Sequence, residues 1–299
     1  MEKILITGST GLLGYWISKI FIESNFNVYL VYNTHEPKFK DAEKIALDIT
    51  NFEKVKETLK KVKPDVIIHS AALTDVDLCE KEKELAYNVN VNGTRNFIKS
   101  LYTLNLSSKF IYISTDYVFD GQKGNYREYD IPNPINYYGL TKLLGEEVTK
   151  TYNNYIIIRT SALFGFSPSG KENFGLIALK KLINNEKVKA FVDQIVSPTY
   201  VEFLADAIFK LIKLEISNDI LHIAGEAMSR YDFALKLAKI LNKENLIEKS
   251  FLNEANFIAK RPKNSSLNVE KQKNYKLYTY TIEECIEKFI KTYYAYQKS

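Results

Sequence analysis

The segment KILITGSTGLLG, residues Lys3–Gly14, decides the fold. Its first five residues form an apolar run typical of a short buried strand, and glycines at positions 8, 11 and 14 follow at once. Glycine suits this turn because the backbone needs unusual angles, approaches a pyrophosphate closely and packs tightly on the next helix. An apolar stripe with Leu13, Trp16 and Phe21 predicts that helix, whose N-terminus offers N–H groups and a positive dipole end to phosphates. The segment therefore predicts a dinucleotide-binding loop.

Strand-like and helix-like segments alternate through the first half of the chain. Strands are expected at Asn27–Tyr32, at Val66–His69, from Phe110 and at Tyr155–Arg159, and helices at Glu53–Val62 and from about Leu78 to Leu106. Such alternation implies a parallel sheet covered by helices on both faces. We therefore expect an α/β fold with a Rossmann-type doubly wound parallel sheet, and a ligand site at the carboxyl ends of its strands.

The pattern changes near residue 161. The segment SALFGFSPSGKENF, residues Ser161–Phe174, is rich in Gly, Ser and Pro, and beyond it the elements become shorter and alternate less regularly. We therefore expect a dinucleotide-binding domain over residues 1–165 and a smaller C-terminal α/β substrate-binding region over residues 166–299. A segment at about residues 196–216 is expected to rejoin the first domain.

Reactive side chains follow the strand that starts at residue 110. That strand leads into STDYVFDG, residues 114–121, and the segment YYGLTKLLGEE places Tyr138 and Lys142 four residues apart. On a helix this spacing puts both side chains on one face, where the ammonium is expected to lower the pKa of the phenol toward neutrality. Two other Tyr–Lys pairs have this spacing, so the position after the strand selects this one. With the Thr115 hydroxyl to orient a carbonyl, the set predicts hydride transfer at a carbon–oxygen bond.

Composition argues against several classes of protein. The net charge is +5 from 41 basic and 36 acidic residues, and no basic block is interleaved with aromatic residues as nucleic-acid grooves require. Cys79 and Cys285 form no metal-spaced set, so no metal site is expected. The N-terminus lacks a signal-peptide pattern, and no apolar run approaches the length of a membrane span. We therefore expect a cytoplasmic protein with a small-molecule substrate, no nucleic acid and no membrane contact.

Motifs along nearly the whole chain match one family. They are GSTGLLG, LDIT, HSAALTDVDLCE, STDYVFDG, YGLTKLLGE, RTSALFG, DQIVSPTY, HIAGEAMSRYDFA and RPKNSSLN. The chain resembles the extended short-chain dehydrogenase/reductases, and within them the dTDP-4-dehydrorhamnose reductase family. The segments AALTDVD, DQIVSPTY and RPKNSSLN are more specific to this branch. The resemblance implies an NAD(P)H-dependent oxidoreductase that reduces a 4-keto nucleotide sugar, as in dTDP-rhamnose biosynthesis.

The resemblance also implies roles for individual residues. Tyr138 is the implied proton donor to the sugar C4 oxygen, Thr115 and Lys142 complete the catalytic set, and Lys142 holds the nicotinamide ribose. The residues implied to bind the cofactor are Gly8, Thr10, Gly11, Leu12, Leu13, Gly14, Asn33, Asp48, Ile49, Ala71, Ala72, Thr74, Tyr138 and Lys142. The residues implied to bind the substrate are Thr115, Asp116, Asn173 and Arg261. The alternatives are an Asx turn for Asp116 and a solvated side chain for Arg261.

Two positions bear on specificity. Reductases of the family commonly carry a tryptophan where RTSALFG has Ala162, so we expect a sugar pocket of a different shape. The stretch Tyr32–His35 has no carboxylate to grip a ribose hydroxyl, whereas Lys38 and Lys40 could offset a 2′-phosphate. We therefore expect NADP(H) to be preferred over NAD(H).

Other functions on this frame stay open. A dehydratase is disfavoured because Thr115 is followed by Asp116 and Tyr117, without the Glu that follows Asp in dehydratases. A sugar-nucleotide epimerase, which has no net consumption of cofactor, is one alternative. The chain also resembles the regulatory subunit of methionine adenosyltransferase, which binds a dinucleotide as part of a complex. A homodimer is expected only by analogy with relatives.

Overall fold

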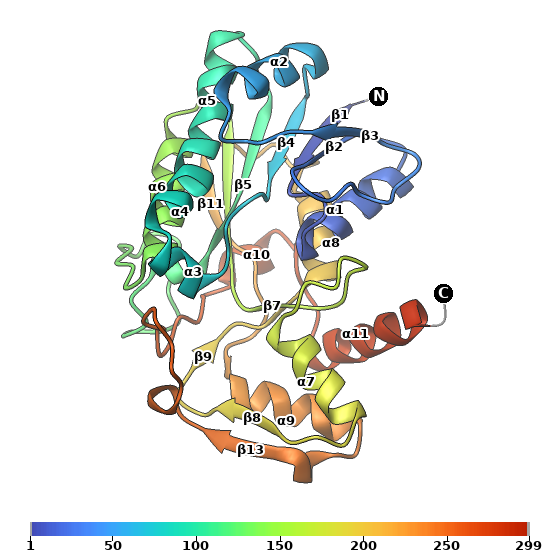
Figure 1. Ribbon diagram of the computed structural model, residues 1–299, viewed down its shortest axis with the longest axis vertical. Coiled ribbons are helices and arrows are strands. Elements are labelled where there is room, and N and C mark those ends of the chain that lie inside the picture. Colours follow the sequence, from blue (N-terminus) through green and yellow to red (C-terminus); the bar gives the residue numbers. More distant parts are fainter. Residues whose placement is uncertain (1, 298–299) are drawn as a thin grey trace.

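A seven-stranded parallel sheet forms the centre of the molecule (Figure 1). The computed structural model describes residues 2–297. The strands lie in the order β11-β6-β5-β4-β1-β2-β3, and every neighbouring pair is parallel. Their bounds are β1 Lys3–Thr7, β2 Asn27–Tyr32, β3 Glu43–Ala46, β4 Val66–His69, β5 Lys109–Thr115, β6 Tyr155–Thr160 and β11 Asp219–His222. The strand order reverses between β1 and β4, which confirms the predicted Rossmann-type doubly wound sheet.

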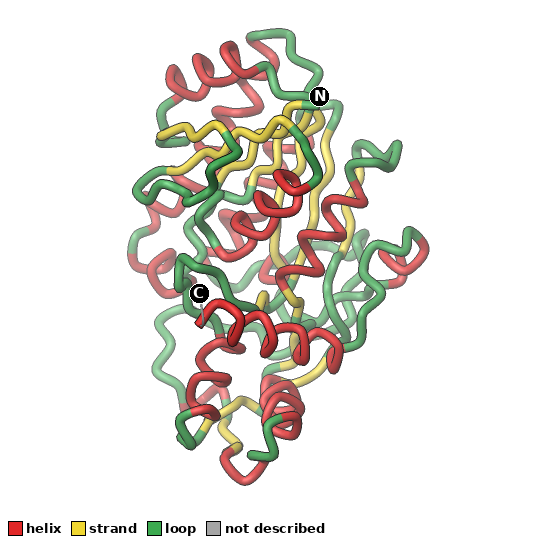
Figure 2. Tube along the Cα trace, turned by 90° about the vertical axis from the view of Figure 1, so that its right-hand side faces the viewer, coloured by secondary structure: helices red, strands yellow, loops and turns green. Residues whose placement is uncertain are grey.

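Alternate residues of the strands face two different layers of helices. Ile4 and Ile6 of β1 belong to the core formed with the helices α1 and α8, whereas Leu5 belongs to the core formed with α2 and α5. These helices are α1 Leu12–Glu23, α8 Val201–Leu211, α2 Phe52–Val62 and α5 Gly93–Thr103, and α6 Tyr137–Lys150 packs beside α5. Figure 2 shows helices on both sides of the strands. Burial on both faces explains why the strands read as continuous apolar runs.

The helical stretch expected from about Leu78 to Leu106 is divided in the structure. It consists of α3 Val76–Lys81, α4 Lys83–Tyr87, a π-helical turn Asn88–Asn92 and α5. The Asn90 side chain accepts a hydrogen bond from the Leu73 N–H at 2.8 Å and donates to the Leu73 carbonyl at 3.1 Å and to Thr141 at 3.0 Å. The wider turn thus brings a polar side chain between the segment after β4 and α6, which apolar periodicity does not reveal.

Two strands of the sheet were not predicted. The edge strand β3 is mostly exposed, so its sequence EKIA lacks the apolar run of a buried strand. The strand β11 pairs with β6 although 58 residues separate their ends, because α8 first crosses to pack on α1. The segment from α8 through β11 thus packs against the sheet and its helices, and the predicted division into domains stays a prediction.

The smaller region is built from short elements below the sheet in Figure 1. Its strands are β7 Leu163–Phe164, β8 Val188–Phe191, β9 Ile195–Val196, β10 Thr199–Tyr200, β12 Met228–Ser229 and β13 Ile247–Ser250, paired as β10–β7, β12–β9 and β13–β8. Its helices are α7 Phe174–Ile183, α9 Arg230–Ile240 and α11 Ile282–Gln297, and α10 Glu270–Asn274 contacts β11. Short 3₁₀ turns lie at Asp116–Val118, Glu244–Leu246 and Leu252–Glu254.

Two kinds of feature are absent from the described residues. Among residues 2–297, no helix combines the length and the apolar character needed to cross a bilayer. The same part of the chain has no group of three or more His, Cys, Asp or Glu side chains placed to hold a metal ion.

Candidate active site

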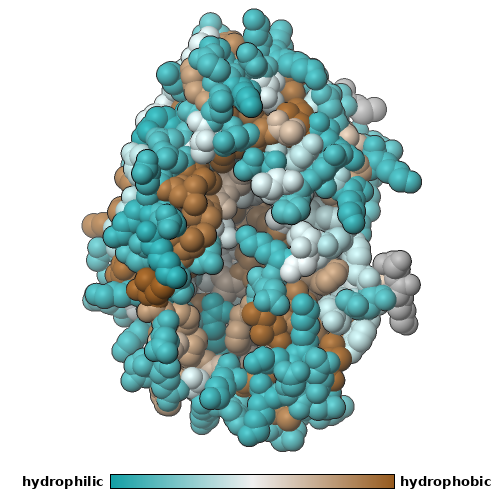
Figure 3. Space-filling view, viewed as in Figure 1, coloured by the Kyte–Doolittle hydropathy of each residue, from teal (hydrophilic) through white to brown (hydrophobic). Residues whose placement is uncertain are grey.

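A cavity of about 710 Å³ opens at the carboxyl ends of the central strands. A hollow is visible in the middle of the face shown in Figure 3. The residues predicted to bind the cofactor all line this cavity: Gly8, Thr10, Gly11, Leu12, Leu13, Gly14, Asn33, Asp48, Ile49, Ala71, Ala72, Thr74, Tyr138 and Lys142. Thr115 and Asn173 line it as well, whereas Asp116 and Arg261 do not. The sequence therefore located the cavity, and the contacts of these residues with a ligand stay predictions.

The glycine loop forms a cradle that side chains would fill. Gly8 has a φ of +65°, and a Cβ atom on it would lie 2.9 Å from the backbone nitrogen of Ala71. A Cβ atom on Gly14 would lie 2.1 Å from the Gly8 carbonyl oxygen, so β1 and α1 approach as only glycine permits. Gly11 precedes α1 without a side-chain cap, which leaves the N–H groups of the first turn available to an anion. These residues fit the diphosphate of a dinucleotide.

The far end of the cavity carries Asn33 and Asp48. The Asp48 carboxylate accepts hydrogen bonds from the backbone N–H of Thr50 at 2.9 Å and from its hydroxyl at 2.8 Å. These bonds hold the turn after β3, so the backbone that lines the cavity there is fixed by its own side chain. Lys38 and Lys40 are not among the residues that line the cavity.

Thr115, Tyr138 and Lys142 meet at one wall of the cavity. Thr115 ends β5, and α6 begins after Asn136, whose side chain accepts a hydrogen bond from the Gly139 N–H at 2.8 Å. This cap determines where α6 starts and so places Tyr138 and Lys142 one turn apart on it. The side chain of Thr115 hydrogen-bonds the Tyr138 phenol. The structure therefore brings together the three residues that the sequence selected.

Burial dominates the acidity of the phenol. Although part of Tyr138 faces the cavity, its surroundings exclude enough water to raise its pKa well above the usual value, and the hydrogen bond with Thr115 opposes this only in part. Burial also lowers the pKa of Lys142 to about 7, against the charge of Glu146. The expectation that Lys142 brings the pKa of Tyr138 toward neutrality is therefore wrong. Tyr138 is protonated at neutral pH, which is the state that a proton donor needs.

Lys142 belongs to a buried cluster that holds α6 on the sheet. Its ammonium lies 4.1 Å from the centroid of the Tyr112 ring on β5. One turn further along α6, the buried Glu146 accepts hydrogen bonds from Arg159 of β6 at 2.9 and 2.7 Å and from the Ser114 hydroxyl of β5 at 2.5 Å. Because the partners come from both β5 and β6, the cluster fixes the helix that carries Tyr138 relative to these two strands.

Asp116 is buried among hydroxyl groups. Its carboxylate accepts hydrogen bonds from Ser161 at 2.8 Å, from Ser265 at 2.5 Å and from Thr115 at 3.1 Å. Burial raises the pKa of Asp116, and these hydrogen bonds oppose the rise. The two serines come from the motifs RTSALFG and RPKNSSLN, which therefore converge on one carboxylate. The predicted contact of Asp116 with a sugar stays a prediction, since its described partners are these hydroxyls.

Arg261 and Asn173 also have partners within the protein. Arg261 pairs with Asp77 on α3 at 3.0 Å and donates a hydrogen bond to the Ala259 carbonyl at 2.8 Å. Its side chain is only 12% exposed, so the solvated alternative is wrong. Asn173 is the N-cap of α7, and its amide donates to the Gly165 carbonyl at 2.8 Å. Contacts of either residue with a substrate stay predictions.

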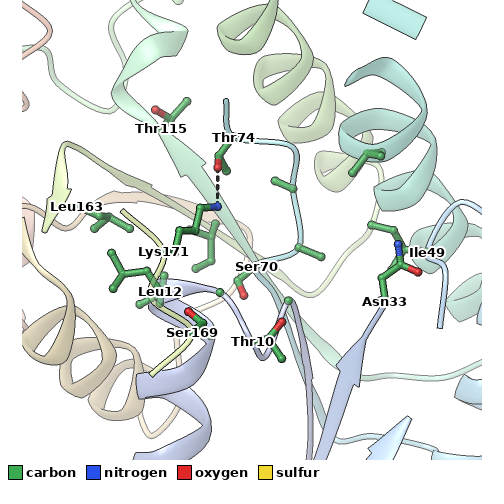
Figure 4. A pocket seen from close by; sticks show the side chains of 18 of the residues that line it. Thr10, Leu12, Asn33, Ile49, Ser70, Thr74, Thr115, Leu163, Ser169 and Lys171 are labelled. Atoms are coloured by element: carbon green, nitrogen blue, oxygen red, sulfur yellow. Dashed lines mark hydrogen bonds between the residues drawn. The ribbon is translucent and has the colours of Figure 1, made fainter. Parts of the chain in front are cut away.

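Thr160 and Lys171 are two of the polar cavity residues that were not predicted. Thr160 ends β6 opposite Thr115 of β5, and its hydroxyl is buried without a hydrogen-bond partner. Lys171 reaches across the cavity and donates a hydrogen bond to the Thr74 hydroxyl at 2.9 Å (Figure 4). Thr160 could have been found from its place at the end of an apolar strand. Nothing in the sequence links Lys171 to Thr74, because 97 residues separate them.

Comparisons with known proteins identify one family. The family model for the RmlD substrate binding domain matches residues 1–295. The dTDP-4-dehydrorhamnose reductase of Aggregatibacter actinomycetemcomitans is 34% identical over 285 residues, which cover 91% of this chain and 92% of the relative. Methionine adenosyltransferase 2 subunit beta of Xenopus laevis is 32% identical over 278 residues, which cover 90% of this chain and 81% of the relative.

A solved structure extends the match to three dimensions. The dTDP-4-dehydrorhamnose reductase of Bacillus anthracis, in complex with NADP, superposes with a TM-score of 0.85 at 32% identity. The superposition covers 97% of this chain and 98% of that one. The chain therefore belongs to the RmlD substrate binding domain family, in agreement with its resemblance to the extended short-chain dehydrogenase/reductases.

Proposed function

We propose that the protein is an NADPH-dependent reductase of a 4-keto nucleotide sugar, of the type carrying deoxythymidine diphosphate. The observation that carries this proposal is the placement of Thr115, Tyr138 and Lys142 in the same cavity as the glycine cradle at Gly8 and Gly14. The relatives named dTDP-4-dehydrorhamnose reductase, one of them solved with NADP, support the substrate class and the cofactor.

The residues of the cavity fit this reaction. The cofactor, when bound, supplies a hydride. Tyr138, which its raised pKa keeps protonated, donates a proton to the C4 oxygen of the substrate. Thr115 shares a hydrogen bond with that phenol and orients the same oxygen, so the reacting carbonyl has one preferred position. Lys142 holds the ribose next to the reacting ring, at the base of the same wall.

The two regions of the chain divide the ligands between them. Residues 1–165, with the returning segment, hold most of the dinucleotide, and residues 166–299 hold most of the sugar nucleotide. Asn173 lies where these regions meet at the cavity, and Arg261 joins the C-terminal segment to α3. A homodimer and a cytoplasmic location also remain part of the proposal, and size-exclusion chromatography with light scattering would test the first.

A substrate screen with one variant tests the proposal. NADPH absorbance is followed with a panel of nucleotide-linked 4-keto sugars, for the natural chain and for Tyr138→Phe. Removal of the general acid should lower kcat by about 10²–10⁴-fold, while the Kd of NADPH changes by less than about threefold. A Tyr138→Phe protein that keeps full activity, or that no longer binds NADPH, would show that the phenol is not the proton donor.

A regulatory subunit is the second candidate, and the similarity to methionine adenosyltransferase 2 subunit beta favours it. A pull-down with such a subunit would recover a stable synthetase partner, and the subunit would reduce no sugar in the screen. The amount of NADPH consumed per sugar distinguishes an epimerase from a reductase, because an epimerase converts the sugar without net loss of NADPH. Stoichiometric NADPH loss with a 4-keto sugar excludes both alternatives.

A further inference from the structure

The loop between β7 and α7 is closed at its neck. At residues 165–173 the side-chain amide of Asn173 donates through Nδ2 to the Gly165 carbonyl at 2.8 Å and accepts through Oδ1 from the Gly165 N–H at 3.4 Å. Inside the loop, the Gly170 N–H donates to the Ser167 carbonyl at 2.9 Å. Gly170 has a φ of +68°, which turns the chain back toward Asn173. The loop is therefore a folded unit with a defined tip.

The loop is attached to the first domain at two points, one near its base and one near its tip. At its base, the Trp16 indole N–H on α1 donates to the Phe166 carbonyl at 2.7 Å. At its tip, the Lys171 ammonium donates to the Thr74 hydroxyl at 2.9 Å, and Ser169 and Lys171 line the cavity (Figure 4). The loop thus spans from the helix that follows the glycine cradle to the segment that follows β4.

The charges at the cavity single out Lys171. Among residues 2–297, the cations that line the cavity are Lys142 and Lys171, and the anions are Asp48 and Glu172. Lys142 lies deep against the Tyr112 ring, and Glu172 lies 3.8 Å from Lys180. Lys171 is bonded only to a neutral hydroxyl in the described contacts, which is a weaker acceptor than a phosphate oxygen.

The position of the Thr74 hydroxyl relates Lys171 to the diphosphate cradle. Thr74 lies three residues after Ala71, and a Cβ atom on Gly8 would lie 2.9 Å from the Ala71 backbone. The segment whose Thr74 holds the lysine amine therefore begins beside the glycine loop. The N-terminus of α1 offers only partial positive charge there, so a diphosphate with two negative charges lacks a full counter-charge without Lys171.

We propose that Lys171 is a diphosphate-binding residue, which the loop 165–173 carries across the cavity and which exchanges the Thr74 hydroxyl for a phosphate oxygen of the dinucleotide. The inference deepens the proposed function and rests on it for the identity of the ligand. A bound phosphate would give the Lys171 ammonium a charged partner in place of the neutral Thr74 hydroxyl. A charge-assisted hydrogen bond of this kind should change affinity by about 10- to 100-fold.

The test is a set of binding measurements on the full chain. Lys171→Met should raise the Kd of NADPH and of ADP-ribose, which carries the diphosphate, by at least about tenfold. It should leave the Kd of adenosine 2′-phosphate, which lacks the diphosphate, within about twofold of the natural value, and Lys171→Arg should restore most of the loss. Lys181→Met is the matched control, because Lys181 is exposed on α7 and does not line the cavity. The affinity of Lys171→Met should also fall less steeply with added salt.

A second readout does not depend on substitution. Trypsin cleavage after Lys171 in the natural protein should slow when ADP-ribose is bound, and should not slow with adenosine 2′-phosphate. An unchanged NADPH Kd in Lys171→Met, or an equal loss for adenosine 2′-phosphate, overturns the inference while the reductase proposal stands. If the natural protein reduces no sugar but Lys171→Met still raises the Kd of ADP-ribose, the proposed function is overturned and the inference stands.

Discussion

Replacing Lys142 with methionine should stabilise the protein while abolishing its proposed activity. Lys142 is 3% exposed, and burial lowers its pKa from 10.5 to about 7. Since one pKa unit corresponds to about 1.4 kcal/mol, keeping the lysine charged in the folded protein costs about 5 kcal/mol below pH 7. The contact with the Tyr112 ring returns about 1–2 kcal/mol of this. Methionine has a similar shape without the charge, so the free energy of unfolding should rise by about 3 kcal/mol.

The gain in the free energy of unfolding should become smaller as the pH rises. The pKa of Lys142 is lower in the folded protein than in the unfolded chain, so the unfolded chain binds more protons between about pH 7 and 10.5. The cost of the lysine is therefore fully present below pH 7 and disappears as the pH rises toward 10.5. Methionine does not titrate, and the groups that act on Lys142, Glu146 and Cys79, are the same in both proteins.

Urea unfolding at several pH values between about 6 and 9 measures this difference, with the fluorescence of the single Trp16 as the signal. Lys150→Met on the same helix is the control, because Lys150 makes a surface pair with Glu147 that contributes about 1 kcal/mol at most. A Lys142→Met protein less stable than the natural chain at every pH refutes the reasoning. So does a stability difference that stays constant from pH 6 to 9.

The remaining predictions concern two buried polar groups near the cavity. Thr160→Val removes a buried hydroxyl that has no hydrogen-bond partner, so the free energy of unfolding should stay equal or rise by about 1 kcal/mol. Because this hydroxyl lines the cavity, the KM of a cavity ligand should increase severalfold. A variant that is less stable than the natural protein in urea unfolding would contradict this prediction. Asp116→Asn replaces an acceptor that serves the hydroxyls of Ser161 and Ser265, so the free energy of unfolding should fall by about 1–3 kcal/mol, and unchanged stability would show that these bonds contribute nothing.

Local features of the chain were sufficient to predict the frame of the molecule. The glycines of Lys3–Gly14 determine a turn that admits no Cβ, and alternating apolar runs determine strands buried on both faces. The place of Tyr138 and Lys142 on α6 follows from their spacing in the chain and from the Asn136 cap. Each of these features depends on neighbours in sequence and on steric limits, so the sequence alone reveals it.

Contacts between distant segments decided what these residues can do. Asp116 meets Ser265 across 149 residues, and Lys171 meets Thr74 across 97, so no local pattern announces either pair. The pKa of Lys142 depends on how much water the folded chain excludes, which spacing along a helix does not determine. The sequence by itself therefore determined the five central strands of the sheet, the cradle and the reactive set. Only the tertiary structure decided the protonation of that set and the contact of Lys171 with Thr74, because desolvation and long-range partners exist only once the chain has folded.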